Sequence, residues 1–272
     1  MVPFHLASSR QGETTLRLAV FSDVHGNLTA LEAVLADISK RAVDKIVFAG
    51  DLCLVGPRPA ECLDRVRDLD GVPGFGCTAV YGNTDDWLLG RQQPPPPLAD
   101  LAQWTYDQLS HSQRKWLDDL PFAHTVSASG SDDRPLLIVH ANPQDVNQLI
   151  FPPEEEQIQL YGRVRQADDK LDDVLQGVQA NTIIFGHLHI PSIRSWDGKT
   201  LYNISSVSMP GDGDPRAKYG LFTWDNDAWQ FERIYVRYEW AVESAAYRTR
   251  QPPAWQKQVE TITAQGYISQ NV

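Results

Sequence analysis

Apolar runs of strand length alternate with helical patterns in the first third of the chain. The segments Leu16–Phe21 and Lys45–Ala49 are continuous apolar runs, which is typical of strands buried on both faces. Residues 59–69 read as a helix after the second run, and "TAVYGN" reads as a third strand. After the first run, with Asn27 as the N-cap, apolar residues recur at helical spacing: Leu28, Leu31, Val34, Leu35 and Ile38. Alternation of strands and helices predicts a parallel sheet.

A proline-rich stretch interrupts this pattern. The run "RQQPPPPL", with prolines at positions 94–97, predicts a stiff polyproline II spacer instead of a fold element. Helical patterns follow at residues 98–109 and 112–120, the second capped by Ser112 and ended by Pro121. We interpret residues 90–121 as a helical insertion, which is either a lid over a site or a packing element.

The second half of the chain favours antiparallel pairing. The runs "PLLIVHA" and "NTIIFGHLH" predict two buried strands. Two hairpins are predicted after them, "SIRSW"/"LYNISS" around Asp197-Gly198 and "GLFTW"/"WQFERIYV" around Asp225-Asn226. This antiparallel sheet is expected to pack against the first. We expect a flexible leader over residues 1–14, one domain over 15–238, and a helical tail over 239–272 packed on the domain.

The composition and net charge of the chain indicate which classes of binding partner are unfavourable. With 42% hydrophobic and 22% charged residues, the 272-residue chain has the composition of a soluble globular protein. Its formal net charge of −11 disfavours non-specific binding to nucleic acid or anionic membranes. A phosphate substrate is still compatible with this charge, because a bound cation can dominate the field at one site.

The termini and the cysteines indicate a cytoplasmic protein. The N-terminal segment has no long apolar region of the kind that signal peptides have, and no run of about 18 apolar residues occurs. We therefore expect neither secretion nor a membrane span. Three cysteines without a C-x-x-C pair are typical of reduced thiols, and Cys53 is interpreted as a packing residue.

Metal-capable side chains follow five of the predicted strands. Taken singly, a histidine after a strand is most often a satisfied core residue, and an aspartate there is most often a turn or N-cap residue. Ligand sites of open α/β sheets lie at the carboxyl ends of the strands, so five such coincidences favour one common site. The residues are Asp23, His25, Asp51, Asn83, His140, His187 and His189. Their number and type suit two metal ions.

The same residues lie in ordered motifs. The series "DVH", "GD", "GN", "H" and "GHLH" resembles the calcineurin-like metallophosphoesterase superfamily over most of residues 16–224. The stretches "AGDLCLVGPRP", "VYGNTDD", "FGHLHIP" and "SMPGDGDPRAKYGL" resemble a bacterial and archaeal branch of small phosphodiesterases and phosphatases. The resemblance implies an α/β fold, a β-sandwich of two mixed sheets flanked by helices in four αββα layers.

The resemblance also implies two ligand sets. Asp51 would bridge both ions, and the glycines before Asp51, Asn83 and His187 are expected to allow the tight turns that direct these ligands inward. One ion would be held by Asp23, His25 and His189, and the other by Asn83, His140 and His187. Mixed imidazole and carboxylate ligands suit Mn²⁺, Fe, Zn²⁺, Co²⁺ or Ni²⁺ better than Ca²⁺, and we favour manganese.

The implied reaction is hydrolysis of a phosphate ester. Two cations would lower the pKa of a bridging water, so that hydroxide attacks phosphorus in line. Asp51, Asn83 and His140 are the predicted catalytic residues. Asn83, Thr84 and Arg216 are predicted to contact a small phosphate ester or nucleotide substrate, although a loop role for Arg216 is equally compatible with the sequence. Arg58 is interpreted as a solvated loop residue.

One position departs from the family pattern. Many members have histidine where this chain has Thr84, and a threonine hydroxyl is a poor general acid, a role typically worth about 10²–10⁴-fold. We therefore expect a preference for good leaving groups, as in aryl or nucleotide phosphodiesters and cyclic nucleotides. Asp85 or Asp86 is an alternative acid, but Asp85 is better interpreted as a partner of a ligand and Asp86 as a helix cap.

Two other functions remain compatible with the sequence. One is a phosphatase that acts on phosphomonoesters, phosphoproteins or dinucleotide polyphosphates. The other is a non-catalytic protein-interaction module of the same fold, as in family members that have lost ligands. All seven ligand positions are filled in this chain, which favours the enzyme. The oligomeric state is not predicted.

Overall fold

The computed structural model describes residues 15–70, 76–128, 135–225 and 228–261, and the predicted leader lies outside these ranges. The strands are β1 (Leu16–Phe21), β2 (Lys45–Ala49), β3 (Gly76–Val80), β4 (Ala123–Val126), β5 (Leu136–Val139), β6 (Thr182–Phe185), β7 (Ser192–Trp196), β8 (Lys199–Asn203), β9 (Ala217–Asp225) and β10 (Ala228–Val236). The helices are α1 (Leu28–Ile38), α2 (Pro59–Asp70), α3 (Asn83–Leu88), η1 (Pro96–Leu98), α4 (Ala99–Gln108), α5 (His111–Asp118), α6 (Glu154–Tyr161), α7 (Lys170–Leu175) and α8 (Trp240–Arg250).

The first sheet has the strand order β10-β9-β1-β2-β3. Its strands β1, β2 and β3 are parallel, as the alternating pattern predicted. The β9–β10 hairpin pairs antiparallel with β1, with Leu18 opposite Phe222. The prediction that this hairpin belongs to the second sheet was therefore wrong. It was based on position in the chain, which does not show that β1 has an edge available to pair with β9.

The second sheet has the order β4-β5-β6-β8-β7 and is mixed. The pairs β5–β6 and β6–β8 are parallel, while β4 and β7 pair antiparallel at the two edges. An antiparallel sheet had been expected in this half. The β7–β8 hairpin turns at Asp197-Gly198 as predicted, and both residues have positive φ angles, of 44° and 71°.

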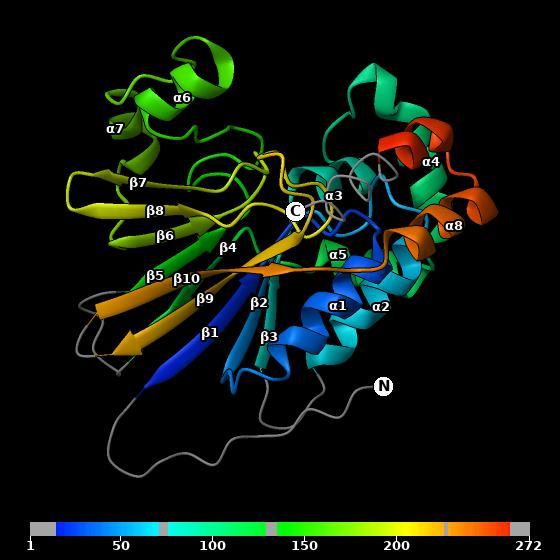
Figure 1. The fold of residues 1–272 in the computed structure, drawn as a ribbon, viewed down its shortest axis with the longest axis horizontal. Coiled ribbons are helices and arrows are strands. Elements are labelled where there is room, and N and C mark those ends of the chain that lie inside the picture. Colours follow the sequence, from blue (N-terminus) through cyan, green and yellow to red (C-terminus); the bar gives the residue numbers. More distant parts are fainter. Residues whose placement is uncertain (1–14, 71–75, 129–134, 226–227, 262–272) are drawn as a thin grey trace.

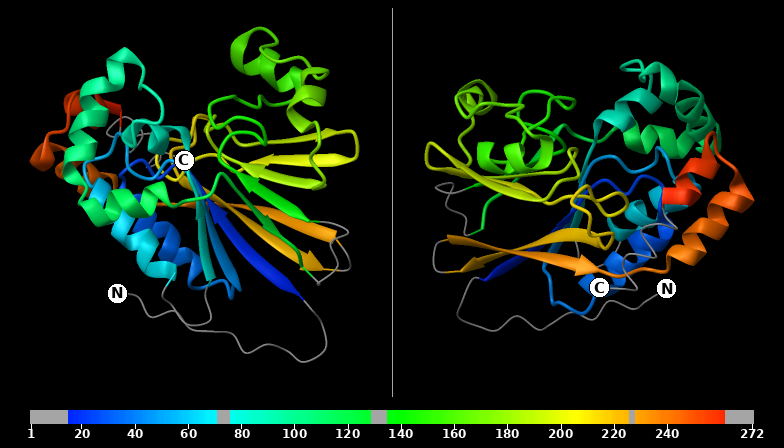
Figure 2. Two further views of the ribbon diagram at one scale, coloured as in Figure 1. Left: turned by 180° about the vertical axis from the view of Figure 1, so that it is seen from behind. Right: turned by 45° about the horizontal axis from the view of Figure 1, so that its top comes forward.

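The two sheets pack face to face between two layers of helices (Figures 1 and 2). On β1, Leu18 and Val20 belong to the apolar cluster between the sheets, whereas Ala19 and Phe21 belong to the cluster under the helices α1 and α2. Both faces of β1 are thus buried, which explains its continuous apolar sequence. The architecture is the four-layer αββα sandwich that the resemblance implied.

The predicted insertion packs into the helical layer. Leu101 and Leu117, from α4 and α5, are buried in the same cluster as α1 and α2. Ser110 caps α5 by accepting the backbone N–H of Gln113, so the predicted cap Ser112 was wrong by two positions. The end of the proline run forms the short 3₁₀ helix η1, so it is not only a spacer.

The tail helix α8 lies against α1. Its Glu243 is fully buried and accepts hydrogen bonds from Arg58 and from the Thr29 hydroxyl, the latter at 2.7 Å. Arg58 is therefore an ion-pair partner in the tail contact, and the prediction of a solvated loop arginine was wrong. Residues 255–261 are also helical, and 262–272 lie outside the described ranges. Across the described ranges, every helix is too short or too polar to span a bilayer.

Candidate metal centre

The loops that follow the strands are joined by hydrogen bonds between backbone groups. The backbone N–H of Asp23 donates to the Gly50 carbonyl at 3.0 Å, and that of His25 donates to the Asp51 carbonyl at 3.0 Å. The two sheets are linked at this end by His140, whose Nδ1 lies 2.9 Å from the Ala49 carbonyl oxygen. All seven predicted ligands are therefore brought to one end of the sandwich.

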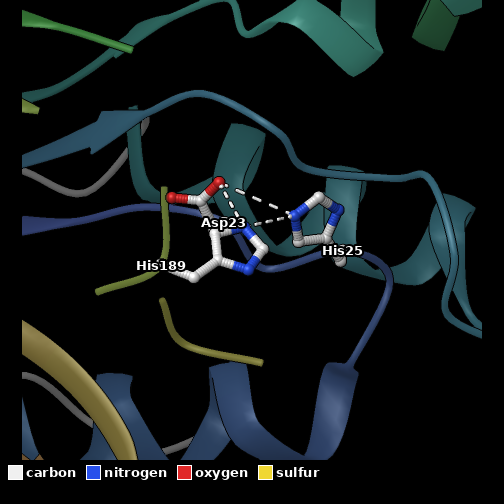
Figure 3. A group of neighbouring side chains, drawn as sticks. All are labelled: Asp23, His25 and His189. Carbon is white, nitrogen blue, oxygen red and sulfur yellow. Dashed lines mark hydrogen bonds and ion pairs between the residues drawn. The ribbon is translucent and has the colours of Figure 1, made fainter. Parts of the chain in front are cut away.

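Three of these side chains converge in a first group. The Nε2 atom of His189 lies 3.0 Å from Oδ1 of Asp23 and 3.2 Å from Nε2 of His25 (Figure 3). The His25 Nε2 atom lies 3.6 Å from the same Asp23 oxygen. Ligands about 2.0–2.2 Å from one ion are about 3.0–3.5 Å apart in tetrahedral or octahedral geometry. The spacing of the group therefore fits one ion.

The other predicted ligands form a second group. The His140 Nε2 atom lies 2.9 Å from Oδ1 of Asn83 and 3.4 Å from Oδ1 of Asp51. The ring of His187 lies beside that of His140, with 5.0 Å between their centroids. Donor atoms of Asp51, His140 and His187 lie within 4.8 Å of one another, as do those of the first group.

The Asp51 carboxylate faces both groups. Its Oδ1 lies 3.4 Å from Nε2 of His140, and its Oδ2 lies 3.7 Å from Nε2 of His25. The side chain is almost completely buried, so water does not screen these oxygens. A carboxylate in this position can contribute one oxygen to each of two ions.

Backbone carbonyls fix the tautomers of three imidazoles. The Nδ1 atom of His25 lies 3.0 Å from the Leu54 carbonyl oxygen, and the Nε2 atom of His187 lies 3.0 Å from that of Asn147. A carbonyl oxygen only accepts, so each of these nitrogens donates, as Nδ1 of His140 does to Ala49. The other nitrogen of each ring then offers its lone pair to the site. Neither Leu54 nor Asn147 was predicted, because a backbone carbonyl leaves no signal in the sequence.

This tautomer leaves two acceptor atoms face to face. The Nε2 lone pair of His140 meets the amide oxygen of Asn83 at 2.9 Å, and the described residues place no proton donor between these two atoms. Two acceptors at this distance repel each other unless a cation or a proton lies between them. The chemistry of the donor set therefore fits a bound metal ion.

Strained backbone is concentrated in the same loops. In the described part of the chain, eleven residues other than glycine have a positive φ. Five of them are predicted ligands: Asp23, His25, Asp51, His187 and His189. Side chains disfavour this conformation, which costs about 1–3 kcal/mol per residue and is typical of functional sites.

Two of the three glycines before ligands have a different role from the one predicted. Gly50 has a φ of +89°, as a tight turn requires. Gly82, at φ −109°, does not need glycine for its conformation. A Cβ atom at Gly82 would lie 2.1 Å from Oδ1 of Asp51, and one at Gly186 would lie 2.1 Å from Oδ2 of Asp23. These two glycines leave space for the carboxylates of neighbouring loops.

Asp85 supports the loop that carries Asp51. Its carboxylate accepts the backbone N–H groups of Asp51 at 3.0 Å, Leu52 at 3.3 Å and Gly82 at 2.8 Å. The contact to Gly82 caps α3, a role that had been predicted for Asp86. Asp86 instead pairs with Arg91 at 3.0 Å, because its side chain points to the segment after the helix. Burial and the charge of Asp51 raise the pKa of Asp85 to about 6.

The protonation states within the groups suit ligands. Burial alone would raise the pKa of Asp23, but His189 and His25 outweigh it and hold this pKa well below its usual range. Burial, with the nearby His140, lowers the pKa of His187 to about 4. An ionised carboxylate and a neutral imidazole are the forms that bind metal ions.

Of the predicted substrate-binding residues, Thr84 lies at the second metal group and Arg216 lies outside both groups. Thr84 donates its backbone N–H to Oδ1 of Asp51 at 2.9 Å, and its buried hydroxyl has no hydrogen-bond partner among the described residues. Arg216 pairs with Asp214, with Nε 3.0 Å from a carboxylate oxygen, and lies 4.5 Å from the centroid of the Tyr235 ring. Its contacts in the described ranges do not include either group, so a role in substrate binding stays a prediction.

Comparisons with known proteins agree with this geometry. The calcineurin-like phosphoesterase superfamily domain matches residues 16–227. The uncharacterized protein MJ0912 of Methanocaldococcus jannaschii is 31% identical over 82% of this chain and 88% of its own length. The phosphodiesterase YfcE of Escherichia coli is 24% identical over 78% of this chain and 89% of its own. The crystal structure of a metallophosphoesterase from Sphaerobacter thermophilus has a TM-score of 0.67 at 27% identity, covering 92% of this chain and 99% of that one.

Proposed function

The chain belongs to the calcineurin-like phosphoesterase superfamily and is a metal-dependent phosphoesterase, and we propose that it hydrolyses phosphodiesters at a pair of divalent metal ions. The observation that carries this proposal is the Asp51 carboxylate, which directs one oxygen to each of the two groups. A single-ion site would not need a buried carboxylate between two sets of imidazoles. We further propose a cytoplasmic location, because Cys53 and Cys62 are buried thiols outside any disulfide, the form that a reducing compartment maintains.

Each proposed ion takes its ligands from both sheets. Asp51 would contact both ions. One ion would be held by Asp23, His25 and His189, and the other by Asn83, His140 and His187. Imidazole nitrogens with carboxylate and amide oxygens suit manganese first, and iron, zinc or cobalt next. Two such ions, when bound, supply Lewis-acid chemistry that activates water and neutralises phosphoryl oxygens.

The protein's own groups orient the reacting phosphate. His140 and Asn83 form one wall of the second group, and the hydrogen bond from His140 to the Ala49 carbonyl holds this wall in place. The buried loops exclude water from the carboxylates, which strengthens their electrostatic effect. We propose that Asp51, Asn83 and His140 are the catalytic residues for these reasons. Thr84 is proposed to contact the substrate through its hydroxyl, for which the described residues supply no hydrogen-bond partner.

The preference for diesters with good leaving groups follows from the acids near the site. Thr84 offers only a hydroxyl, and Asp85 is occupied by three backbone N–H groups of the supporting loops. Neither is a strong proton donor to a departing alkoxide. An aryl or nucleotide leaving group needs less protonation, and the similarity to a protein named as a phosphodiesterase supports this assignment.

The test compares esters in the manganese-loaded protein. We expect a higher kcat/KM for bis(4-nitrophenyl) phosphate than for 4-nitrophenyl phosphate, and little turnover of an alkyl monoester such as glycerol 3-phosphate. Comparable rates for the alkyl monoester and the diester would contradict the proposal and indicate an efficient general acid. Stoichiometric metal binding without turnover of any ester would contradict hydrolysis itself.

A further inference from the structure

A cavity of about 420 Å³ lies between α3 and α4, and α3 begins at Asn83 of the second metal group. Its volume is within the range of small-molecule sites, about 300–1,000 Å³. None of the residues that line it is charged, although the chain carries a net charge of −11. These neutral walls offer no counter-ion to a phosphate or an ammonium group, so they favour an uncharged part of a ligand.

The walls combine aromatic rings with amide groups. Trp87 from α3 and Tyr106 from α4 both line the cavity, and the Arg114 guanidinium lies 4.3 Å from the Tyr106 ring centroid, which restrains that ring. Three glutamines also line the cavity: Gln92, Gln93 and Gln103. Aromatic faces stack on planar rings, and amides both donate and accept hydrogen bonds. A planar, uncharged heterocycle with polar edges matches both properties.

A shared helix and two hydrogen bonds relate the cavity to the second metal group. Asn83 and Trp87 belong to the same short helix and are four residues apart, which is about 6 Å along its axis. Gln92, which lines the cavity, accepts a hydrogen bond from the Asn147 side-chain amide at 2.9 Å. The Asn147 carbonyl oxygen in turn accepts from Nε2 of His187 at 3.0 Å. A phosphate at the metal centre would therefore have its organic substituent within reach of the cavity.

We propose that this cavity binds the nucleobase of a nucleotide substrate, which would make nucleotide phosphodiesters the substrate class. The inference rests on the proposed function, because the phosphate at the metal centre is what brings the base to the cavity. A base stacked on Trp87 or Tyr106 would bind through its face, while the glutamines would contact its edge. The cavity thus contributes to KM more than to the chemical step.

Binding of two phosphates that differ only in the base tests the proposal. Isothermal titration calorimetry of the manganese-loaded protein would compare adenosine 5′-monophosphate with ribose 5-phosphate. We expect the nucleotide to bind at least tenfold more tightly. Equal dissociation constants for the two phosphates would overturn the proposal.

Two variants of cavity residues, with one control variant, test whether the cavity is the source of the tenfold difference in affinity. Ala99, on the exposed start of α4, lines the cavity, and Ala99→Trp should fill it and reduce the nucleotide's affinity to that of ribose 5-phosphate. Gln108→Trp adds the same indole on the opposite face of the helix and should leave the tenfold difference intact. Gln103→Ala provides a milder change at the cavity and should weaken nucleotide binding without adding bulk. An undiminished preference in both cavity variants would place the base elsewhere and overturn the proposal.

Turnover separates this inference from the proposed function. Methyl 4-nitrophenyl phosphate has no base and reports the hydrolytic centre alone. Turnover of this ester, combined with equal affinities for the two phosphates, would overturn the base site and retain the hydrolase. A tenfold preference for the nucleotide without turnover of any ester would retain the base site and overturn the hydrolase.

Discussion

The carboxylate of Asp85 accepts the backbone N–H of Asp51 at 3.0 Å. Asp51 has a positive φ of 62°, a conformation that its side chain disfavours, and Asp85 is fully buried beneath it. The hydrogen bond therefore stabilises a strained residue at the point where the carboxylate must face both groups. Asp85 positions Asp51 without itself reaching the proposed ions.

Replacing Asp85 tests this positioning. Asp85→Ala should lower manganese affinity and kcat/KM by about 10–100-fold, as is typical when an outer partner of a ligand is removed. Asp86→Ala, at the next position, loses only the ion pair with Arg91 and should retain metal affinity. Calorimetric titration of manganese measures both. Equal losses in the two variants would point to a general defect of α3.

Asp51→Asn should affect both ions. The amide keeps the shape but loses the negative charge, so turnover should fall by more than the about 10–100-fold expected for outer partners. Metal content, measured by mass spectrometry of the loaded protein, should fall below two ions. Asp119→Asn, at an exposed position of the chain, is the control. Retained activity would show that Asp51 is not a shared ligand.

Gly82→Ala should disturb the Asp51 carboxylate directly. The added Cβ would lie 2.1 Å from Asp51 Oδ1, and such overpacking typically costs about 1–3 kcal/mol. Gly177→Ala, at a φ of +76° with open space around it, should cost a similar free energy of unfolding, about 1–2 kcal/mol, through the backbone alone. Only Gly82→Ala should also lose manganese affinity. Unchanged manganese affinity would rule out the close approach.

Metal binding should strengthen as the pH rises. Burial lowers the pKa of His25, but Asp23 and Asp51 outweigh it and raise this pKa above 6.5 in the metal-free protein. His25 is then mostly protonated at pH 6 and must lose a proton to bind an ion. Manganese affinity should rise by about tenfold per pH unit per released proton until the pH passes the raised pKa. Titrations at pH 6 and 7 in buffers with different ionisation enthalpies measure the released protons, and a pH-independent affinity would contradict this assignment.

The tail contact should contribute to stability. Glu243→Ala leaves the Arg58 guanidinium partly buried without its carboxylate, and loss of one partner of a buried pair costs about 3–5 kcal/mol. Urea unfolding of the variant should show this decrease in the free energy of unfolding. Lys115→Ala removes an exposed pair with Asp119 and should leave the midpoint unchanged. An unchanged midpoint for Glu243→Ala would mean that the pair with Arg58 contributes no measurable stability.

Local sequence patterns were sufficient for much of the fold and site. The apolar runs of β1 and β2 and the N-cap Asn27 depend on neighbouring residues, and each was predicted at its observed position. The predicted ligands follow the strands directly, so their convergence could also be inferred from the sequence. Pairing between distant segments was harder, as the β9–β10 hairpin shows, because several open strand edges compete for it.

The contacts that orient the side chains of the predicted ligands were the hardest to predict from the sequence. The carbonyls of Leu54 and Asn147 determine which nitrogen of His25 and His187 faces the site, but every residue has a carbonyl. Gly82 was assigned a turn because glycine permits positive φ, whereas its actual requirement is space for Asp51. Helices α6 and α7 were not predicted, because their sequences are short and polar and the spacing of their apolar residues only weakly matches a helix.

The division of the predicted ligands between the two sheets would give bound ions a mechanical role. Asp23, His25, Asp51 and Asn83 follow strands of one sheet, and His140, His187 and His189 follow strands of the other. Neither sheet alone carries a complete set of donors, so each group forms only where the two sheets pack together. Two bound ions would therefore cross-link the two sheets at this end of the sandwich, and chelation should weaken the packing between the sheets before it unfolds either sheet.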